Sequence, residues 1–382
     1  MNGVRVKSLF KHVVYLLVVL ALAGCMTRPA ESPEFRGITP SEAIAVNDVE
    51  IDNPETSLVG SKDRKVILAL SGGGVDGAYG VGVLSGWSLA GTRPKFDVVT
   101  GVSTGALMSV YAFLGSKYDD LLWELYVNQK ESDILRKRGV RGFFSDSLFD
   151  NTPLKKLIEK HMTAELLAQV AAEHAKGRRL YVATTNLDSK ELVVWDMGLL
   201  ASGGADGRTN SLQLFQKVLR ASAAIPVFFP PVYIKPKRGV QLRQAHVDGG
   251  VKAPVLISDF LFQTKAKKRE LYVIINGTLA LEDAFEAVQP NIRDLAAKSV
   301  GALTGELTQQ AVYRGYVRAI NSGTKFNLTA IPEGVPPPKS ALDFNPEYLK
   351  KIYDIGLKTA QEPDFWWGRP PTVKRFDEVS FR

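Results

Sequence analysis

The sequence predicts an α/β fold with a largely parallel central sheet. Short apolar runs alternate along the chain with longer segments of helical periodicity, and glycine-rich loops join several of them. Such alternation is typical of parallel strands that helices connect. A large core is possible, because 45% of the 382 residues are hydrophobic and 23% are charged, close to the average of globular proteins.

The first elements of this fold follow one another directly. Residues 65–70 form an apolar run that ends in glycines, which predicts a buried strand. Residues 78–90 carry apolar side chains between small ones and predict a helix packed closely on the sheet. A second strand at 96–100 and a second helix at 106–114 repeat this order.

The same two patterns predict the later elements. We expect strands at 180–186, 191–195, 240–247, 271–275 and 326–330. We expect helices at 153–161, 163–175, 211–222, 292–321 and 346–361. The first of these helices has a start signal, because Thr152 can cap it and Pro153 would occupy its first position.

The first 24 residues predict a secretory signal. Three basic residues precede an apolar run of about ten residues, whereas a helix that spans a membrane needs about twenty. Residues 22–25, Leu-Ala-Gly-Cys, resemble the lipobox of bacterial lipoproteins, which implies that Cys25 becomes the acylated N-terminus. An ordinary cleaved signal with a chance cysteine is the alternative. Because Cys25 is the only cysteine, a disulfide within one molecule is excluded.

Residues 25–60 predict a flexible tether, because they lack apolar periodicity and contain four prolines. The organised domain is expected at 61–370, followed by a tail at 371–382. The formal charge is +8, and removal of the three basic signal residues leaves 45 basic against 40 acidic residues, or +5. That charge is too mild to indicate a nucleic acid partner. A weak attraction to an anionic membrane and a merely solubilising basic surface are both compatible with it.

The first glycine loop has two interpretations. Gly72, Gly73 and Gly74 follow the first strand, and Gly77 completes a G-x-G-x-x-G spacing before the helix. A dinucleotide site would need an acidic residue at the end of the second strand, but Asp97 stands at its start, so no nucleotide is expected. As an anion pocket, the loop would converge backbone N–H groups on a developing oxyanion. A glycine turn required only for close packing is the simpler alternative.

A nucleophile elbow is predicted around Ser103. The segment Gly101-Val102-Ser103-Thr104-Gly105 matches G-x-S-x-G and lies between a predicted strand and a predicted helix. An elbow needs this position to hold the serine hydroxyl above the sheet edge, and glycines because side chains would collide in so sharp a turn. The alternative is that Ser103 merely caps the helix.

The four histidines do not supply the base of a Ser-His-Asp triad. His12 lies in the signal, and no histidine follows the later acidic candidates at a useful place. His161 and His174 lie in charged helical segments, where exposed positions are the default. His246 lies two residues before Asp248 on the same face of an extended strand, so it could support a site there. The remaining candidate for the base is a carboxylate that acts directly on Ser103.

Asp248 is the candidate carboxylate. It ends an alternating stretch and is followed by Gly249 and Gly250. An Asp-Gly pair between extended segments is also a hairpin signal. The sequence shows no spaced His/Cys/carboxylate set for zinc and no calcium loop, so no metal or other cofactor is expected.

These three clusters, in this order, resemble the patatin-like phospholipase family. Residues 149–154 and 221–226 resemble further family blocks, and the resemblance covers about 66–262, with a helical extension at about 263–370. It implies a three-layer fold in which helices flank the sheet. It also implies that Ser103 is the nucleophile, that Asp248 is the proton acceptor, and that Gly72, Gly73 and Gly74 form the oxyanion hole.

Two departures limit what the resemblance implies. Many members carry Arg or Lys where this chain has Asp76, and many carry Asn where it has Ala253-Pro254. We therefore expect a hydrolase of lipid acyl esters, of phospholipase A, lysophospholipase or esterase type, with the headgroup and oligomeric state left open. A catalytically silent lipid-binding or scaffolding lipoprotein and a peptidase are the alternatives. Met26 in place of a retention aspartate favours the outer membrane, facing the periplasm.

Overall fold

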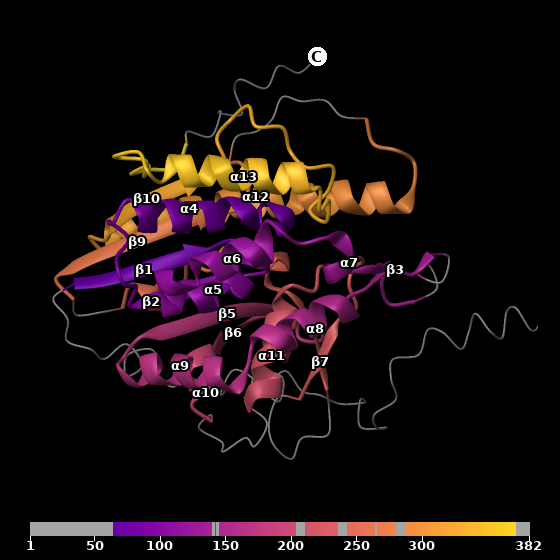
Figure 1. Ribbon diagram of the computed structural model, residues 1–382, viewed down its shortest axis with the longest axis horizontal. Coiled ribbons are helices and arrows are strands. Elements are labelled where there is room, and N and C mark those ends of the chain that lie inside the picture. The colour runs from indigo at the N-terminus through magenta and orange to yellow at the C-terminus, as the bar shows by residue number, and fades with distance from the viewer. Residues whose placement is uncertain are drawn as a thin grey trace, which may run out of the picture.

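An eight-stranded sheet forms the centre of the described part of the chain (Figure 1). The structure is a computed structural model that describes residues 64–139, 142, 145–203, 211–235, 243–263, 266–279 and 287–371. The sheet has the order β10-β9-β1-β2-β5-β8-β7, and β6 also pairs with β5. Its strands are β1 (Arg64–Leu70), β2 (Val98–Val102), β5 (Arg179–Asn186), β6 (Glu191–Asp196), β7 (Val232–Ile234), β8 (Gln244–Asp248), β9 (Lys268–Ile275) and β10 (Lys325–Ala330). The predicted signal, tether and lipidated Cys25 lie outside the described residues.

The helices of the described ranges account for every helix that the sequence predicted. They are α4 (Gly77–Leu89), α5 (Thr104–Leu114), α6 (Asp119–Tyr126), α7 (Glu131–Ile134), α8 (Thr152–His161), α9 (Ala164–Ala175), α10 (Met197–Ala201), α11 (Ser211–Ser222), α12 (Ile292–Asn321) and α13 (Pro346–Thr359). The short α6, α7 and α10 were not predicted. A small second sheet pairs β3 (Arg136–Lys137) with β4 (Phe149–Asp150). No helix within these ranges is both long enough and apolar enough to cross a membrane.

The sheet is parallel in one part and antiparallel in the other. Strands β10, β9, β1, β2 and β5 run parallel, whereas β6 and β8 run antiparallel to β5, and β7 antiparallel to β8. Parallel neighbours need crossover connections, while antiparallel strands can be joined by short turns such as the one at 187–190. The expected largely parallel α/β fold is confirmed.

Helices cover both faces of the sheet, which gives three layers (Figure 1). Alternate residues of β1 point to opposite faces: Val66, Leu68 and Leu70 join one buried cluster, and Ile67 and Ala69 join the other. The first cluster contains residues of α4, α5, α8, α9, α11 and α13. The second contains residues of α12 and of the segment 255–261. A strand buried on both faces reads as a continuous apolar run, as β1 does.

The C-terminal helix α13 packs directly on α4, and the two lie side by side in Figure 1. Small residues make this close approach possible. A Cβ on Gly82 would lie 2.2 Å from the Tyr353 carbonyl oxygen, and one on Gly356 would lie 2.3 Å from the Tyr79 carbonyl oxygen. Since α4 is covered by the sheet on one side and by α13 on the other, nearly all of its side chains are buried.

Two local expectations need correction. Thr152 does not cap α8; it is the first helical residue, and the cap position belongs to Asn151. Thr152 donates its N–H and its hydroxyl to the Asp150 carboxylate, at 2.9 and 2.7 Å. The start of α8 is therefore bound by Asp150, the residue before the cap position. The strand expected at 240–247 is β8, which begins at Gln244.

Candidate active site

Ser103 lies in a sharp turn between β2 and α5. Its φ of 55° and ψ of −126° are rarely adopted by a residue with a side chain. A Cβ on Gly101 would lie 2.5 Å from the Gly105 carbonyl oxygen, and a Cβ on Gly105 would lie 2.4 Å from the Ser71 carbonyl oxygen. A side chain at either glycine would therefore collide with the backbone. Ser103 occupies the position of a nucleophile elbow.

Asp248 lies at the end of β8, buried, with its carboxylate beside the Ser103 hydroxyl. Burial raises the pKa of Asp248 to about 6, although hydrogen bonds from the Ser103 hydroxyl and the Gly250 amide oppose the rise. The Gly250 N–H donates to the carboxylate at 2.7 Å. No lysine, arginine or histidine in the described ranges forms an ion pair with Asp248. The pKa of the Asp248 carboxyl therefore lies close to neutral pH.

The segment 221–226 connects the two residues. The Ser222 hydroxyl accepts the Ser103 N–H at 3.0 Å and donates to the Ala183 carbonyl at 2.7 Å. The Ala224 carbonyl accepts the Asp248 N–H at 3.0 Å. Sequence reasoning singled out this segment only by resemblance and missed the role of Ser222 in holding the elbow.

The glycine loop lies against Ser103, but its three amides are not equivalent. A Cβ on Gly72 would lie 3.0 Å from the Ser103 Cβ. The Gly72 N–H donates to the Pro254 carbonyl at 2.8 Å, so it is already used within the protein. Among the described residues, no acceptor takes the N–H of Gly73 or of Gly74. Only these two amides of the expected trio are free to bind an oxyanion.

Asn276, which follows β9 directly, holds this loop in place. Its side-chain amide donates to the Ser71 carbonyl at 2.7 Å, and its Oδ1 accepts the Gly80 N–H at 3.1 Å. Its own N–H donates to the Ser71 hydroxyl oxygen at 2.8 Å. Gly73 has a φ of 156°, and a Cβ there would lie 1.9 Å from the Asn276 carbonyl oxygen. Sequence reasoning missed Asn276, and its place after a buried strand was the only available signal.

Asp76, the departure from the family pattern, is engaged by the C-terminal extension. The Tyr348 hydroxyl on α13 donates to Asp76 Oδ1 at 2.6 Å. Next to it, the Val75 N–H donates to the Ala341 carbonyl at 3.0 Å. The carboxylate thus has a structural partner, and the segment around 341–348 forms a cover on the glycine loop.

The remaining motif glycines are sites of close packing. A Cβ on Gly77 would lie 2.5 Å from Thr104 Oγ1, and one on Gly249 would lie 2.5 Å from the Ala183 carbonyl oxygen. Gly77 thus packs on Thr104, the residue after Ser103, and Gly249, the residue after Asp248, packs on β5.

An apolar pocket opens beside Ser103. It has a cavity volume of about 110 Å³. Its wall includes Leu107 of α5, Leu154 of α8, Phe229, and Phe344 from the C-terminal extension. The pocket can hold a hydrocarbon chain while an ester group lies at the serine.

None of the described histidines stands in the place of a catalytic base. His161 lines the apolar pocket, so the expectation of a solvated surface position is wrong; burial and Lys160 lower its pKa. His174 is half-buried, 3.6 Å from Asp196. His246 does not line the pocket: it is fully buried, and its Nδ1 lies 3.0 Å from the Thr184 hydroxyl. Within the described ranges, no group of His, Cys, Asp and Glu is arranged to hold a metal ion.

Comparison with known proteins identifies one family. The model of the family described as patatin-like phospholipase matches residues 68–261, about half of the chain. Among solved structures, the crystal structure of VipD from Legionella pneumophila is similar with a TM-score of 0.39 and 13% sequence identity, over 78% of this chain. This chain spans 66% of the length of that structure. No curated protein matches.

Proposed function

Because this chain belongs to the patatin-like phospholipase family, we propose that it is a serine acyl hydrolase that cleaves lipid acyl esters with Ser103 and Asp248. The observation that carries the proposal is the position of Ser103 beside a buried carboxylate at an apolar pocket. No histidine takes part in this pair. The nucleophile and base are therefore a Ser-Asp dyad.

The chemistry follows from these positions. Asp248 accepts the hydroxyl proton while Ser103 Oγ forms a bond to the acyl carbonyl carbon. The amides of Gly73 and Gly74 stabilise the oxyanion of the tetrahedral intermediate. As the ester bond breaks, the leaving alcohol takes the proton from Asp248. Water then attacks the acyl enzyme, again giving a proton to Asp248, and releases the fatty acid as Ser103 recovers its hydrogen.

Labelling with a fluorophosphonate probe tests this proposal. The probe should modify the protein at Ser103, and the purified protein should hydrolyse acyl esters in a panel of phospholipids, lysophospholipids and simple esters. Ser103→Ala should lose both reactions. A silent scaffold would show neither labelling nor turnover, and cleavage of peptides without cleavage of esters would indicate a peptidase.

We also propose that lipidated Cys25 anchors the enzyme in the outer membrane, facing the periplasm. The lipobox-like residues 22–25, the short apolar run before them and Met26 support this proposal. Cys25→Ser should move the protein out of the membrane fraction. Unchanged fractionation, together with no acyl group on Cys25 by mass spectrometry, would contradict the anchor.

A further inference from the structure

A basic groove lies between α8 and α11, next to the apolar pocket. Its lining includes Lys155 and Glu159 from α8, and Gln213, Lys217 and Arg220 from α11. The α11 residues recur at intervals of three and four, so they lie on one face of that helix. The groove has a cavity volume of about 260 Å³.

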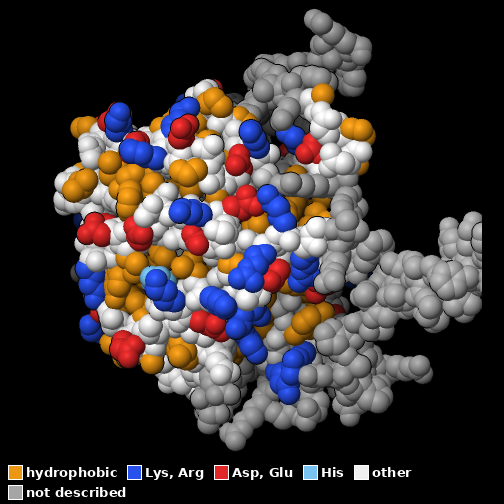
Figure 2. Space-filling view, turned by 45° about the vertical axis from the view of Figure 1, so that its right-hand side comes forward, with side chains coloured by type: hydrophobic (Ala, Val, Ile, Leu, Met, Phe, Trp, Pro, Cys, Tyr) orange, Lys and Arg blue, Asp and Glu red, His pale blue; other side chains and the backbone are white. Residues whose placement is uncertain are grey.

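Positive charge in this groove exceeds negative charge. Lys155, Lys217 and Arg220 line it, against the single carboxylate of Glu159, which Lys155 already pairs at 2.8 Å. That leaves Lys217 and Arg220 as the surplus. Figure 1 shows α8 and α11 next to each other in the lower half of the ribbon, and Figure 2 shows Lys and Arg side chains gathered below the centre of the face that it draws.

Arg220 lines this groove and has a side-chain donor that no described residue uses. Its Nε is buried, and no acceptor among the described residues takes its hydrogen. A buried donor without an acceptor is costly, so such atoms in proteins usually have a ligand or water partner. Burial lowers the pKa of Lys217, and so do the nearby charges of Arg243, Arg220 and Lys235. Several cations close together favour an anion between them.

The groove and the apolar pocket share a wall. Ile158 of α8 lines both, its neighbour Leu157 lines the pocket, and Glu159 lines the groove. On α11, Arg220 lies two residues before Ser222, whose hydroxyl holds the nucleophile elbow. A molecule with one apolar arm and one anionic group could therefore contact both cavities while its ester lies at Ser103.

We propose that the groove between α8 and α11 binds the phosphate group of a lipid whose acyl chain occupies the apolar pocket. This inference rests on the proposed function and adds to it a subsite in which Lys217 and Arg220 bind the anionic group. Charge-assisted hydrogen bonds from a guanidinium and an ammonium suit phosphate oxygens.

The test compares two soluble esters below their critical micelle concentrations, dihexanoyl phosphatidate and dihexanoylglycerol, which differ only in the phosphate. The wild type should show a higher kcat/KM for the phosphatidate. Lys217→Gln and Arg220→Gln should each lower kcat/KM for the phosphatidate by about tenfold and leave that for dihexanoylglycerol within about twofold. Lys156→Gln, which removes an exposed charge on α8 outside the groove, is the matched control and should change neither. Equal losses on both esters, or none, would overturn the proposal.

A binding measurement separates this proposal from the proposed function. If neither ester is hydrolysed, the proposed function fails, and calorimetry on the intact protein still decides the groove. Binding of dihexanoyl phosphatidate that Lys217→Gln weakens and Lys156→Gln does not would support the groove. No binding, or binding insensitive to Lys217→Gln, would overturn it. Inorganic phosphate that binds as tightly as the phosphatidate, with the same dependence on Lys217, would show that the ligand is free phosphate and not a lipid.

Discussion

Asp248 beside Ser103 and Glu173 near the start of β5 are two carboxylates in opposite surroundings. Asp248 is buried with no ion pair to any described residue, and burial raises its pKa to about 6. Burial also acts to raise the pKa of Glu173, but hydrogen bonds from Lys176, Lys95 and Arg178 outweigh it and lower the pKa to about 2. Within one domain, the neighbouring cations decide which carboxylate can take up a proton near neutral pH.

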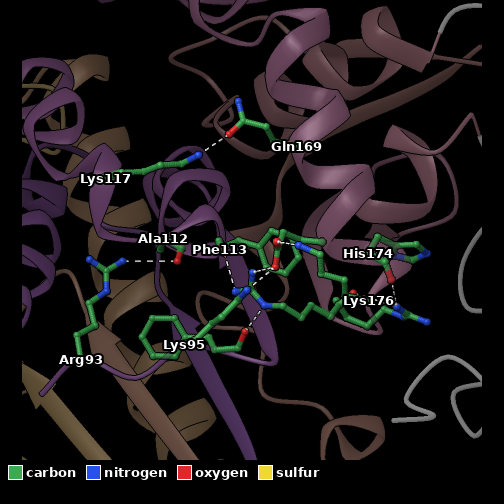
Figure 3. Close-up of polar contacts among 12 residues, drawn as sticks. Arg93, Lys95, Ala112, Phe113, Lys117, Gln169, His174 and Lys176 are labelled. Atoms are coloured by element: carbon green, nitrogen blue, oxygen red, sulfur yellow. Dashed lines mark hydrogen bonds and ion pairs between the residues drawn. The ribbon is translucent and has the colours of Figure 1, made fainter.

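The region around Glu173 is held together by ion pairs and hydrogen bonds of charged side chains. Arg178, which is nearly buried, donates to Glu173 and to the carbonyls of Phe96 and Phe113, so it ties α9, α5 and the start of β2 together. Figure 3 shows neighbouring contacts of the same kind, such as Lys117 with Gln169. Around Ser103, by contrast, backbone strain and unused amides persist. One end of the sheet is built for stability, and the other retains strain and free donors where chemistry needs them.

The largest effect is expected at the dyad. Ser103→Ala and Asp248→Asn should each lower kcat by a factor on the order of 10³ or more, because each removes a group that forms or breaks bonds. Steady-state kinetics on a soluble ester measures the loss, after circular dichroism has shown that both variants are folded. If Asp248→Asn kept a kcat near that of the wild type, the base would be another residue.

The opposite end should respond in stability and not in rate. Glu173→Gln leaves the Arg178 guanidinium without its carboxylate, which should cost about 2–4 kcal/mol of unfolding free energy. Lys350→Gln breaks an exposed pair with Asp354 and should cost less than about 1 kcal/mol. Urea unfolding measures both, and kcat should remain near the wild-type value. A Glu173→Gln protein as stable as the control would show that the cluster adds no stability.

The two carboxylates should also give opposite pH dependences. Since Asp248 acts as a base, kcat/KM should rise with pH through about 6 and level off above it. Its raised folded pKa adds stability below its unfolded pKa near 3.9, and this stability is lost as pH rises through 6. Asp248→Asn should therefore gain stability relative to the wild type between pH 4 and 7, by up to about 3 kcal/mol.

The stability from Glu173 has the opposite sign. It is present above the unfolded pKa near 4.5 and is lost as pH falls through about 2. Unfolding of Asp248→Asn and Glu173→Gln across this pH range checks both signs. A flat rate profile between pH 5 and 8 would contradict a titrating Asp248.

The smallest effects should come from the histidines. His161→Ala, His174→Ala and His246→Ala should each leave kcat/KM within about tenfold, or about 1.4 kcal/mol of barrier. His161 lines the pocket and so should act mainly on substrate binding, whereas His246 is buried away from the pocket. If any of these variants lost as much kcat/KM as Ser103→Ala, that histidine would be the base of a Ser-His-Asp triad.

The sequence by itself predicted most of the fold, and it singled out Ser103 and Asp248, which the structure brings together. A strand, a turn and a helix are set by neighbours in the chain, so β2, Ser103 and α5 could be read together. Asp248 followed from a pattern of residue types and from the lack of a suitably placed histidine. Two predictions were wrong: that Thr152 caps α8 and that His161 is solvated. The structure shows Thr152 donating to the Asp150 carboxylate, and His161 lining the apolar pocket.

Only the tertiary structure decided which residues bind the residues of the site and what pKa Asp248 has. Ser222 reaches Ser103 across 119 residues, Asn276 reaches Ser71 across 205, and Tyr348 reaches Asp76 across 272. No local pattern encodes partners so far apart. The same packing pairs the Gly72 N–H with the Pro254 carbonyl and buries Asp248. Desolvation of a carboxylate depends on every segment that excludes water from it. The residues of the site can be recognised from short sequence patterns. Their pKa values and their unused hydrogen-bond donors depend on the folded chain.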